Sequence, residues 1–518
     1  MGWEGCQSWP AEPSAIAALA HQASYSSLSS GPLPRLGLSA WASSLPSTAR
    51  GLYKEGMAEL TTEELPVVKW PACGVQGCIG IRLDGQKSCL AHVLSEVRDA
   101  SVGALEPGAP LDLRGVQVSE EMFQTILEAM RTAAAGRPQL GEARFDKAQF
   151  TGDASFQGAR FSGVAWFEGA QFSGASFEGT QFSPDASFEG TQFSGVARFD
   201  NAQFSGDAWF QGAQFSDSVS FEGTQYSGEA RFDKAQFSRD ASFQGTQFSM
   251  ARQLGPVRAD VGLDLAGAVF SADILIEAAT PQLSFVGARF EGAASLNLRF
   301  AEIVLDGTLF AKPSTISFAM DAFKDLDEAE LVARRPTATP RLLSVRRVDL
   351  STVSVSDLDL SACLFTGAHN LEKLHIEGPL QAATTPRWRL YIAGRGLPIP
   401  RWMRRATLAE EHQRRASPRP AAAAQDPRWG FLCPSWCPVG CQTPTWVVGK
   451  TGQEPLPPSW ESLAQLYRAL RKGLEDQKNA PGAADFYYGE MEMRKRSPSS
   501  FADGVVLWIY WLLSGYGL

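Results

Sequence analysis

Three cysteines and one histidine lie within twenty residues of one another and form the strongest candidate for a chemical site in this sequence. They are spaced C-x4-C-x10-C-x2-H, and the residues are Cys73, Cys78, Cys89 and His92. Three thiolates and one imidazole are the donors of a closed tetrahedral zinc site, which leaves no coordination position for a catalytic water. We therefore predict a structural zinc ion here. Buried free thiols are the alternative, because the first pair is spaced more widely than the usual two residues.

No group of residues in this sequence predicts catalysis. The chain has 518 residues with eight Cys and five His, and its first basic residue is Arg35, so no secretory signal and no disulfide framework are expected. Cys433, Cys437 and Cys441 lack a fourth ligand nearby, and we interpret them as free thiols. His412 has no set of catalytic partners. Without a Gly-rich dinucleotide loop or a nucleophile paired with a base, we expect a protein that is not an enzyme.

The elements that follow this site are dominated by one repeat. Between 142 and 249 an aromatic side chain recurs every five or six residues, twenty times in succession, from Phe145 and Phe150 through Tyr226 to Phe248. A small residue stands two positions before each aromatic, and Gly usually stands two positions after it. This period belongs neither to a strand nor to a helix, and it predicts a solenoid whose interior is shared by the large and the small residues.

The unit small-x-Phe-x-Gly resembles the pentapeptide repeat. The resemblance implies a right-handed quadrilateral β-helix, with one repeat on each side and four sides in each coil. Here the spacing alternates between five and six, which lengthens the coil to about 22 residues and is interrupted only between Phe172 and Phe177. We therefore expect a mainly β fold in which residues four repeats apart stack at about 4.8 Å.

In that register the outward residues before each aromatic sort by side. Two sides carry mostly Gln, and we predict amide ladders of structural use: Gln149, Gln171, Gln192, Gln214 and Gln236, and Arg160, Gln181, Gln203, Gln225 and Gln247. The side between them carries Arg144, Trp166, Ser187, Trp209 and Arg231. Exposed Trp flanked by Arg is typical of an interaction hot spot, so we predict that this column binds a protein partner. The alternative is that each indole simply covers the small Ser187.

The residues after each aromatic are acidic on two sides. They include Asp146, Glu168, Glu189 and Asp233 on one side and Glu178, Asp200 and Glu222 on the opposite side. Segment 142–249 holds fourteen Asp and Glu against seven Lys and Arg, a formal charge of −7 in a chain of −9. Acidic columns are similar to those of pentapeptide proteins that imitate DNA and bind gyrase, which is an alternative function, although Arg144, Arg198 and Arg231 weaken the imitation. Nucleic acid itself is not an expected partner.

The repeats need covered ends. Residues 111–118 predict a lead-in strand, and Ser119 predicts the cap of a helix that Gly136 ends, with an apolar stripe formed by Met122, Phe123, Ile126, Leu127 and Met130. We expect this helix to cover the open end of the solenoid. After residue 250 the spacing of the large apolar residues becomes irregular. Segment 251–380 therefore predicts irregular coils of the same solenoid, interrupted by a helical segment around 322–335. Cys363 stands in the small interior position before Phe365 and is interpreted as a packing residue.

The C-terminal part predicts a different structure. Segment 387–419 has nine Arg against two Glu and suits anionic phosphate, in lipid headgroups or nucleic acid, or a solvated linker. Residues 462–478 and 483–495 predict a helical hairpin broken at 479–482. The sequence of this hairpin resembles the segment before the membrane span of bacterial, particularly actinobacterial, membrane-associated pentapeptide-repeat proteins. The resemblance runs from Leu-Tyr-Arg-Ala-Leu-Arg to Phe-Tyr-Tyr-Gly-Glu-Met-Glu-Met-Arg.

The last fifteen residues, 504–518, carry no charge. As a helix they measure about 22 Å, which is short of the bilayer's hydrocarbon core of about 30 Å. We interpret them as a membrane-associated segment, either interfacial or part of a truncated transmembrane helix. Its predicted anchors are Trp508, Tyr510 and Trp511. The preceding Arg494, Lys495 and Arg496 predict the cytoplasmic side for the large N-terminal part.

These patterns together predict eight regions. They are a poorly defined segment (1–60), a zinc knuckle (61–100), the lead-in strand and capping helix (101–140), regular repeats (141–250), degenerate coils (251–380), a basic and Pro-rich linker (381–458), the hairpin (459–500) and the membrane-associated segment (501–518). The predicted function is a membrane-tethered, non-catalytic scaffold that presents a rigid surface to protein partners. The alternatives are a DNA mimic acting on gyrase and the regulatory domain of a truncated, channel-like membrane protein.

Overall fold

The computed structural model of this protein describes residues 68–132, 136–385, 405–416, 457–498 and 501–514. The segment predicted to be poorly defined and the thiols Cys433, Cys437 and Cys441 lie outside the described residues.

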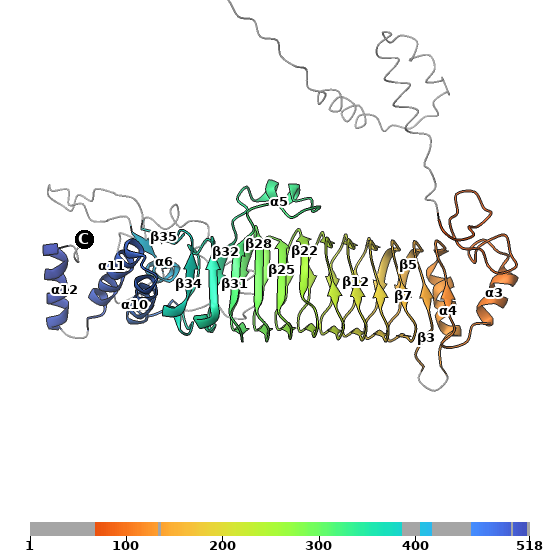
Figure 1. Cartoon of the computed structure of the whole chain (residues 1–518), viewed down its shortest axis with the longest axis horizontal. Coiled ribbons are helices and arrows are strands. Elements are labelled where there is room, and N and C mark those ends of the chain that lie inside the picture. The colour runs from red at the N-terminus through yellow and green to blue at the C-terminus, as the bar shows by residue number, and fades with distance from the viewer. Residues whose placement is uncertain (1–67, 133–135, 386–404, 417–456, 499–500, 515–518) are drawn as a thin grey trace, which may run out of the picture. The chain divides into compact units, whose positions relative to one another are not determined.

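Short parallel strands stacked in successive coils form a solenoid of about 11 turns (Figure 1). Gln149 pairs with Gln171, and Gln171 pairs in turn with Gln192. Phe145 stacks on Phe167, four aromatic positions later, with ring centroids 4.9 Å apart. Each regular coil therefore has four sides, and the predicted mainly β, four-sided solenoid is confirmed.

The strands of the solenoid fall into three sheets. The first side consists of β1 (Leu111–Asp112), β4 (Ala143–Arg144), β7 (Ala165–Trp166), β10 (Ala186–Ser187), β14 (Ala208–Trp209) and β18 (Ala230–Arg231). The fourth side consists of β3 (Gln139–Leu140), β6 (Arg160–Phe161), β9 (Gln181–Phe182), β13 (Gln203–Phe204), β17 (Gln225–Tyr226), β21 (Gln247–Phe248), β24 (Val269–Phe270), β27 (Arg289–Phe290) and β30 (Leu309–Phe310).

The second and third sides form one sheet, because some of their strands run on around the corner between them. These strands are β2 (Gln117–Val118), β5 (Gln149–Ser155), β8 (Gln171–Ser176), β11 (Gln192–Phe193), β12 (Ala197–Arg198), β15 (Gln214–Phe215), β16 (Val219–Ser220), β19 (Gln236–Phe237), β20 (Ala241–Ser242), β22 (Gln253–Ala259), β23 (Leu263–Asp264), β25 (Ile274–Ala279), β26 (Gln282–Ser284), β28 (Ala294–Arg299), β29 (Glu302–Val304), β31 (Ser314–Phe318), β32 (Arg341–Ser344), β33 (Val353–Ser356) and β34 (His375–Glu377).

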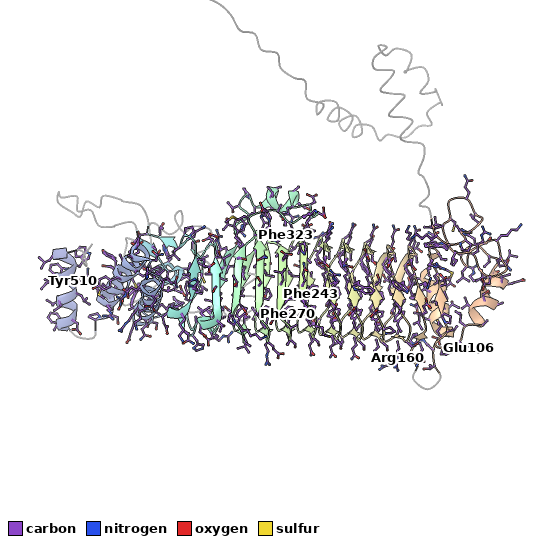
Figure 2. All side chains as sticks on the ribbon, in the orientation of Figure 1. Glu106, Arg160, Phe243, Phe270, Phe323 and Tyr510 are labelled. Atoms are coloured by element: carbon purple, nitrogen blue, oxygen red, sulfur yellow. The ribbon has the colours of Figure 1, made fainter. Side chains whose placement is uncertain are left out.

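The aromatic side chains fill the interior of the regular coils. Within a column the rings lie parallel, as in Phe188 on Phe210 with centroids 4.8 Å apart and planes at 1°. Between columns they meet edge to face, as in Phe177 and Phe188 at 5.3 Å and 87°. Both are favourable ring geometries. Figure 2 labels Phe243 inside the solenoid and Arg160 on its outer surface, in agreement with their buried and exposed side chains.

The Gly that follows each aromatic by two positions turns the corner. Gly169 has φ of 62°, a left-handed conformation that costs little only for a residue without Cβ. Lys147 holds the same position with φ of 54°. The repeat therefore tolerates a side chain at this corner at the cost of some backbone strain.

The coils continue past 250 with a shorter period. Phe270 pairs with Phe290 and Phe290 with Phe310, so these coils contain 20 residues. The corner between the first two sides disappears, because β25, β28 and β31 run through it as longer strands. Aliphatic residues replace most of the Phe in the core, and Cys363 is buried there as predicted.

A loop leaves the coils between β31 and β32. Its helix α5 (Ala329–Arg334) has six residues, so the predicted helix around 322–335 is correct in place but too long. Buried Glu328 accepts a hydrogen bond from Arg299 at 2.9 Å and fixes the loop to the coil.

Helices close the solenoid at its N-terminal end. Helix α4 (Glu120–Ala129) begins after Ser119, whose hydroxyl accepts the Met122 N–H, and its Phe123 ring lies 4.7 Å from Phe156 in the first coils. The predicted capping helix is confirmed, but the prediction that Gly136 ends it is wrong. The apolar stripe finishes at Met130, and the helix ends there. Helix α3 (Ser95–Gly103) precedes it.

At the C-terminal end two successive coils carry the short 3-10 helices η2 (Leu350–Thr352) and η3 (Leu371–Lys373). The last coil meets α6 (Ala409–Ala416) and a helical hairpin of α10 (Trp460–Asp476) and α11 (Ala480–Arg496), and α12 (Phe501–Ser514) follows. Gln477 in the hairpin turn donates to Leu374 O at 2.7 Å. The break in the hairpin is shorter than predicted, because Asn479 caps α11 and Pro481 fits in its first turn.

Two described stretches of the predicted basic linker belong to this folded end. Strand β35 (Ala383–Thr384) pairs antiparallel with β36 (Ala406–Thr407), and α6 is largely buried. The rest of the linker lies outside the described residues.

Candidate metal centre and surface sites

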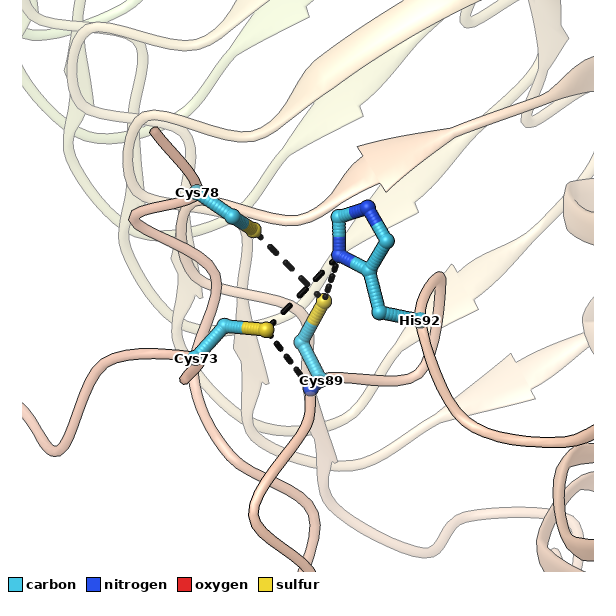
Figure 3. Close-up of side chains that lie close together, drawn as sticks. All are labelled: Cys73, Cys78, Cys89 and His92. Atoms are coloured by element: carbon cyan, nitrogen blue, oxygen red, sulfur yellow. Dashed lines mark hydrogen bonds between the residues drawn. The ribbon is translucent and has the colours of Figure 1, made fainter. Parts of the chain in front are cut away.

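The four predicted metal ligands converge (Figure 3). Their ligand atoms all lie within 4.8 Å of one another. The Sγ atoms of Cys78 and Cys89 are 3.8 Å apart, and His92 Nδ1 lies 3.3 Å from Cys89 Sγ. His92 Nδ1 is 3.7 Å from Cys73 Sγ. Tetrahedral bonds of about 2.3 Å to sulfur and about 2.0 Å to nitrogen would place two sulfurs about 3.8 Å apart, and sulfur about 3.5 Å from nitrogen. The cluster could therefore hold a metal ion as it stands.

The loop that carries the ligands is shaped by two left-handed turns and by hydrogen bonds to sulfur. Gly77 and Gly85 have φ of 83° and 72°. The Cys89 N–H donates to Cys73 Sγ at 3.4 Å, and the Gly80 N–H donates to Cys78 Sγ at the same distance. Hydrogen bonds of this kind favour the thiolate, which is the form that binds a metal.

The thiols differ in acidity. Burial opposes ionisation of Cys73, but hydrogen bonds from the backbone N–H groups of Val75 and Cys89 and with the side chains of His92 and Cys89 together outweigh it and lower the pKa of Cys73 to about 7. Burial raises the pKa of Cys89 to about 12. A divalent cation among these ligands would displace the Cys89 proton, because a coordinating thiol is deprotonated.

The metal-site loop also extends the hydrogen-bond ladder of the first coil. On this side, each coil donates a backbone N–H to the next, as Gly115 does to Asp146 O at 2.8 Å. The first coil has no coil before it, and Ile81 N–H donates to Arg114 O at 2.8 Å in its place. The Arg114 guanidinium carbon lies 5.2 Å from the centre of the Trp70 ring. The loop thus occupies the edge at which a further coil would pair.

The predicted Trp column is present on the first side of the solenoid. Its strands pair in the expected register, in the order Arg144, Trp166, Ser187, Trp209 and Arg231. Ser187 is only 1% exposed, since an indole lies on each side of it along the column. Both Trp side chains are half-buried, not exposed as the sequence suggested.

The arginines at the two ends of this column are paired with acids. Arg144 lies 2.7 Å from Glu142, and Arg231 lies 3.3 Å from Asp233. Next to the column, burial raises the pKa of Glu168, and the charges of its stacked neighbours Asp146 and Glu189 raise it further. The acidic column is therefore present, and its stacked charges oppose one another around Glu168.

The Gln columns are present in the predicted register. Gln171 donates to Gln192 at 3.5 Å, which is the long limit of a hydrogen bond. The exposed amides are thus held mainly by the backbone ladder.

Helix α12 carries the predicted membrane residues. Phe501, Val506 and Leu513 are 90%, 63% and 79% exposed, and Trp508 and Tyr510 are exposed as well. Trp511 instead packs on α11, because its Nε1 donates to Tyr488 Oη at 3.2 Å and the Lys495 ammonium lies 4.1 Å from its ring centre.

The prediction of a transmembrane helix is not met in the described residues. None of the helices there combines the length and the apolar character required to cross a bilayer.

The family model of pentapeptide repeats (9 copies) matches residues 145–192, 177–225, 188–236 and 210–252. Residues 145–252 are pentapeptide repeats. A search of curated proteins and a search of solved structures found no significant match. The family match covers the regular coils, while the metal-site loop and the C-terminal end lie outside it.

The sequence did not predict a buried ionic cluster at the C-terminal end of the solenoid. Glu411 accepts two hydrogen bonds from Arg405, at 3.0 and 2.9 Å, and one from Arg415 at 2.8 Å. Tyr467 donates to the same carboxylate and accepts the Leu408 N–H at 3.0 Å. The only sequence signal is a pair of charges in a basic segment, and nothing in it indicates burial.

Glu410 ends the backbone hydrogen-bond ladder of the coils at the C-terminal edge, as the metal-site loop does at the N-terminal edge. Its carboxylate accepts the backbone N–H groups of Phe365 and Thr366, which face the end of the solenoid. Burial raises the pKa of Glu410. His412, which carried no predicted role, is buried and its Nε2 lies 2.8 Å from Thr407 Oγ1. Glu410 satisfies backbone groups at an edge and His412 contacts a neighbouring hydroxyl, so we assign both a structural role.

Proposed function

We propose that this protein is a non-catalytic scaffold whose pentapeptide repeats present a rigid surface to protein partners and whose α12 attaches it to the cytoplasmic face of a membrane. The observation that carries the proposal is the exposed apolar surface of α12. Phe501, Val506 and Leu513 have no protein cover among the described residues. An apolar helix with Trp and Tyr at its surface and basic residues beside it suits a lipid interface.

The side of the membrane follows from charge. Arg494, Lys495 and Arg496 form the last turn of α11, directly before α12. Basic residues next to a membrane segment favour the cytoplasmic face. The scaffold would then extend from the membrane into the cytoplasm.

Fractionation of cells tests the attachment. Val506→Asp with Leu513→Asp places two charges on the exposed surface of α12 and should move the protein from the membrane fraction to the supernatant. Met250→Asp is the matched control, because Met250 is also exposed but lies on the coils. Equal distribution of wild type and the double variant would refute the membrane attachment.

The partner surface would be the Trp column. The half-buried indoles of Trp166 and Trp209 stand on paired strands on either side of Ser187, and the acids beside them give the surface a negative potential. Replacing both by Ala should weaken cross-linking to partners in membranes without lowering stability by more than a few kcal/mol. Recovery of the same partners with the double variant would remove this surface from the proposal.

Zinc is the metal we infer for the centre. Three thiolates and an imidazole favour zinc among the common divalent ions, and a filled tetrahedral shell makes it a structural ion. Its function would be to hold the loop that pairs with the first coil.

DNA mimicry directed at gyrase is the second candidate, favoured by the stacked acids of the pentapeptide repeats. A supercoiling assay with the purified protein tests it directly. Unchanged gyrase activity would remove it, and inhibition or protection that is lost on Glu168→Gln with Glu189→Gln would support it.

A further inference from the structure

We propose that the middle of the Trp column binds a basic, proline-rich segment of a partner protein, which lies along the solenoid as a polyproline II helix. The inference rests on the proposed function, in which this column is the partner surface, and it names the class of partner. Three features of the first side carry it: its acids, its two indoles and the spacing between them.

The surface residues of the first side form three columns. The Trp column runs between two others, because buried Ala and Phe separate each of its members from the surface residues two positions before and after it. In the middle three coils these two columns consist of Val164, Asp185 and Asp207, and of Glu168, Glu189 and Gln211. Each Trp therefore has one acid beside it in its own coil, and Ser187 between them has two.

The acids of these middle coils have no basic partner. Four acids and no Lys or Arg occur in the stretches 164–168, 185–189 and 207–211. Backbone groups hold two of the carboxylates in place, since Asp185 accepts the Asp207 N–H at 2.9 Å and Asp207 accepts the Glu229 N–H at 2.8 Å. Among the described residues none of the four acids forms an ion pair, because the arginines of this side pair at its two ends.

The charge on this side is also unfavourable for the acids themselves. Burial raises the pKa of Glu168, and the charges of Asp146 and Glu189 raise it further. The Ser187 hydroxyl donates to Glu168 only at 3.5 Å, the long limit of a hydrogen bond. A cation beside Glu168 would relieve this repulsion, so charge complementarity indicates a basic partner.

The indoles select the kind of cation. Cations of the chain lie over the rings of Trp70 and Trp511, whereas none lies over Trp166 or Trp209 in the part of the chain that the structure describes. Ser187 is only 1% exposed between the two indoles, which leaves an apolar surface bordered by acids. A planar guanidinium group stacks on an indole and pairs with a carboxylate at the same time, so arginine suits this surface better than lysine.

The spacing of the indoles selects the backbone conformation of the partner. Trp166 and Trp209 both pair with Ser187, so they are two strand spacings apart, about 9.6 Å. A polyproline II helix returns to the same face every third residue, after about 9.3 Å. An extended strand does so after about 6.8 Å, and two turns of an α-helix measure about 10.8 Å. Arginines three residues apart in a proline-rich segment therefore match the two indoles best.

Fluorescence polarisation with the whole protein tests this, with a labelled peptide of repeated Arg-Pro-Pro units as the probe. We expect binding that weakens at high salt. A peptide with the same number of arginines, in which Arg and Pro alternate, has no two arginines three residues apart. It should bind about two- to fivefold more weakly, because it loses one cation–π contact.

The variants separate the indoles from the acids. Trp166→Ala with Trp209→Ala should weaken binding of the Arg-Pro-Pro peptide by about tenfold, and Trp209→Ala alone should abolish the preference between the two peptides. Glu168→Gln with Glu189→Gln should weaken binding by about fivefold.

Glu178→Gln with Glu222→Gln is the matched control. It removes two exposed acids from the third side, where the residues before the aromatics are Ser155, Ser176, Arg198, Ser220 and Ser242, with no Trp among them. It should leave binding unchanged. Far-UV circular dichroism checks that every variant is folded.

The outcomes distinguish this inference from the proposed function. If wild type binds the two peptides equally, or if the Glu168 and Glu189 variant loses binding while the Trp variant keeps it, charge alone binds the peptide and the partner class is wrong. The Trp column remains the partner surface in either case if the Trp double variant still loses its cross-linked partners in membranes. If that variant keeps both the peptide and the partners, both proposals fail.

Discussion

The middle of the solenoid and its two ends are stabilised by different kinds of interaction. The regular coils contain stacked rings about one strand spacing apart, and no charged side chain is buried among Phe145 to Phe248. The ends contain a Cys₃His cluster and a buried carboxylate that binds two arginines. A coil is covered by identical coils on either side, whereas an end has no such neighbour. Each end therefore requires specific chemistry that the repeat does not supply.

Removing the metal should have the largest effect, and it should be confined to the N-terminal end. Purified protein is expected to contain one zinc per chain, and Cys89→Ser should contain almost none, because binding by three ligands is far weaker. Structural zinc sites bind with apparent free energies of about 10–16 kcal/mol, so the loop should open without the ion. Hydrogen exchange should rise sharply in residues 70–92 and remain low in the coils.

A metal-free protein with the same protection in that loop would contradict this prediction. Cys363→Ser is the control, since Cys363 is buried in the later coils and is not part of the cluster.

Truncating an interior ring should destabilise the middle by a cavity effect. Phe188→Ala is expected to cost about 3–5 kcal/mol in urea unfolding. Phe210→Ala, one coil later and stacked in the same way, should cost the same within about 1 kcal/mol. A large difference between the two would show that the coils are not equivalent.

Neutralising the carboxylate of Glu411, which Arg405 and Arg415 share, should destabilise the C-terminal end of the solenoid. Glu411→Gln leaves Arg405 and Arg415 buried without their counter-ion, at an expected cost of about 3–5 kcal/mol. Hydrogen exchange should locate the loss in α6 and α10, with the regular coils unchanged. Glu475→Gln, which removes an exposed acid from α10, should change stability by less than about 1 kcal/mol.

The same residue predicts a dependence on pH. Burial alone would raise the pKa of Glu411, but the charges of Arg405 and Arg415 dominate and hold it well below its usual range. Its contribution to stability is therefore complete above the unfolded-state pKa of about 4.3 and is lost as the pH falls below it.

Burial raises the pKa of the neighbouring Glu410, which acts in the opposite direction. The quantity to measure is therefore the difference in stability between wild type and Glu411→Gln. This difference should shrink as the pH is lowered from 6 toward 3, and a constant difference would refute the assignment.

The smallest effect should come from one atom in the middle of the solenoid. Tyr226 stands in an aromatic column between Phe204 and Phe248, and its buried hydroxyl has no hydrogen-bond partner among the described residues. Tyr226→Phe should therefore stabilise the protein by about 1 kcal/mol. The midpoint of urea unfolding measures this, and a destabilised variant would indicate that the hydroxyl is satisfied.

Sequence reasoning succeeded where a pattern repeats. The aromatic period predicts the length of one coil. That length alone predicts that Trp166 pairs with Ser187 on neighbouring strands. The four Cys and His side chains that could hold a metal ion were also identified as a cluster, because residue type and spacing are local. It failed at boundaries that depend on packing. Gly136 is a plausible helix end, but α4 ends where its apolar stripe no longer meets the first coil.

By itself the sequence determined the four-sided solenoid, the residues in its interior and the set of atoms able to bind a metal. Each of these follows from chemistry repeated at short range. Only the tertiary structure decided that Trp166 and Trp209 are half-buried, that Glu411 meets Arg405 and Tyr467, and that Arg414 and Arg496 share the indole of Trp460. Those contacts join segments far apart in the sequence, and no local period or propensity encodes them, because each is made only once in the molecule.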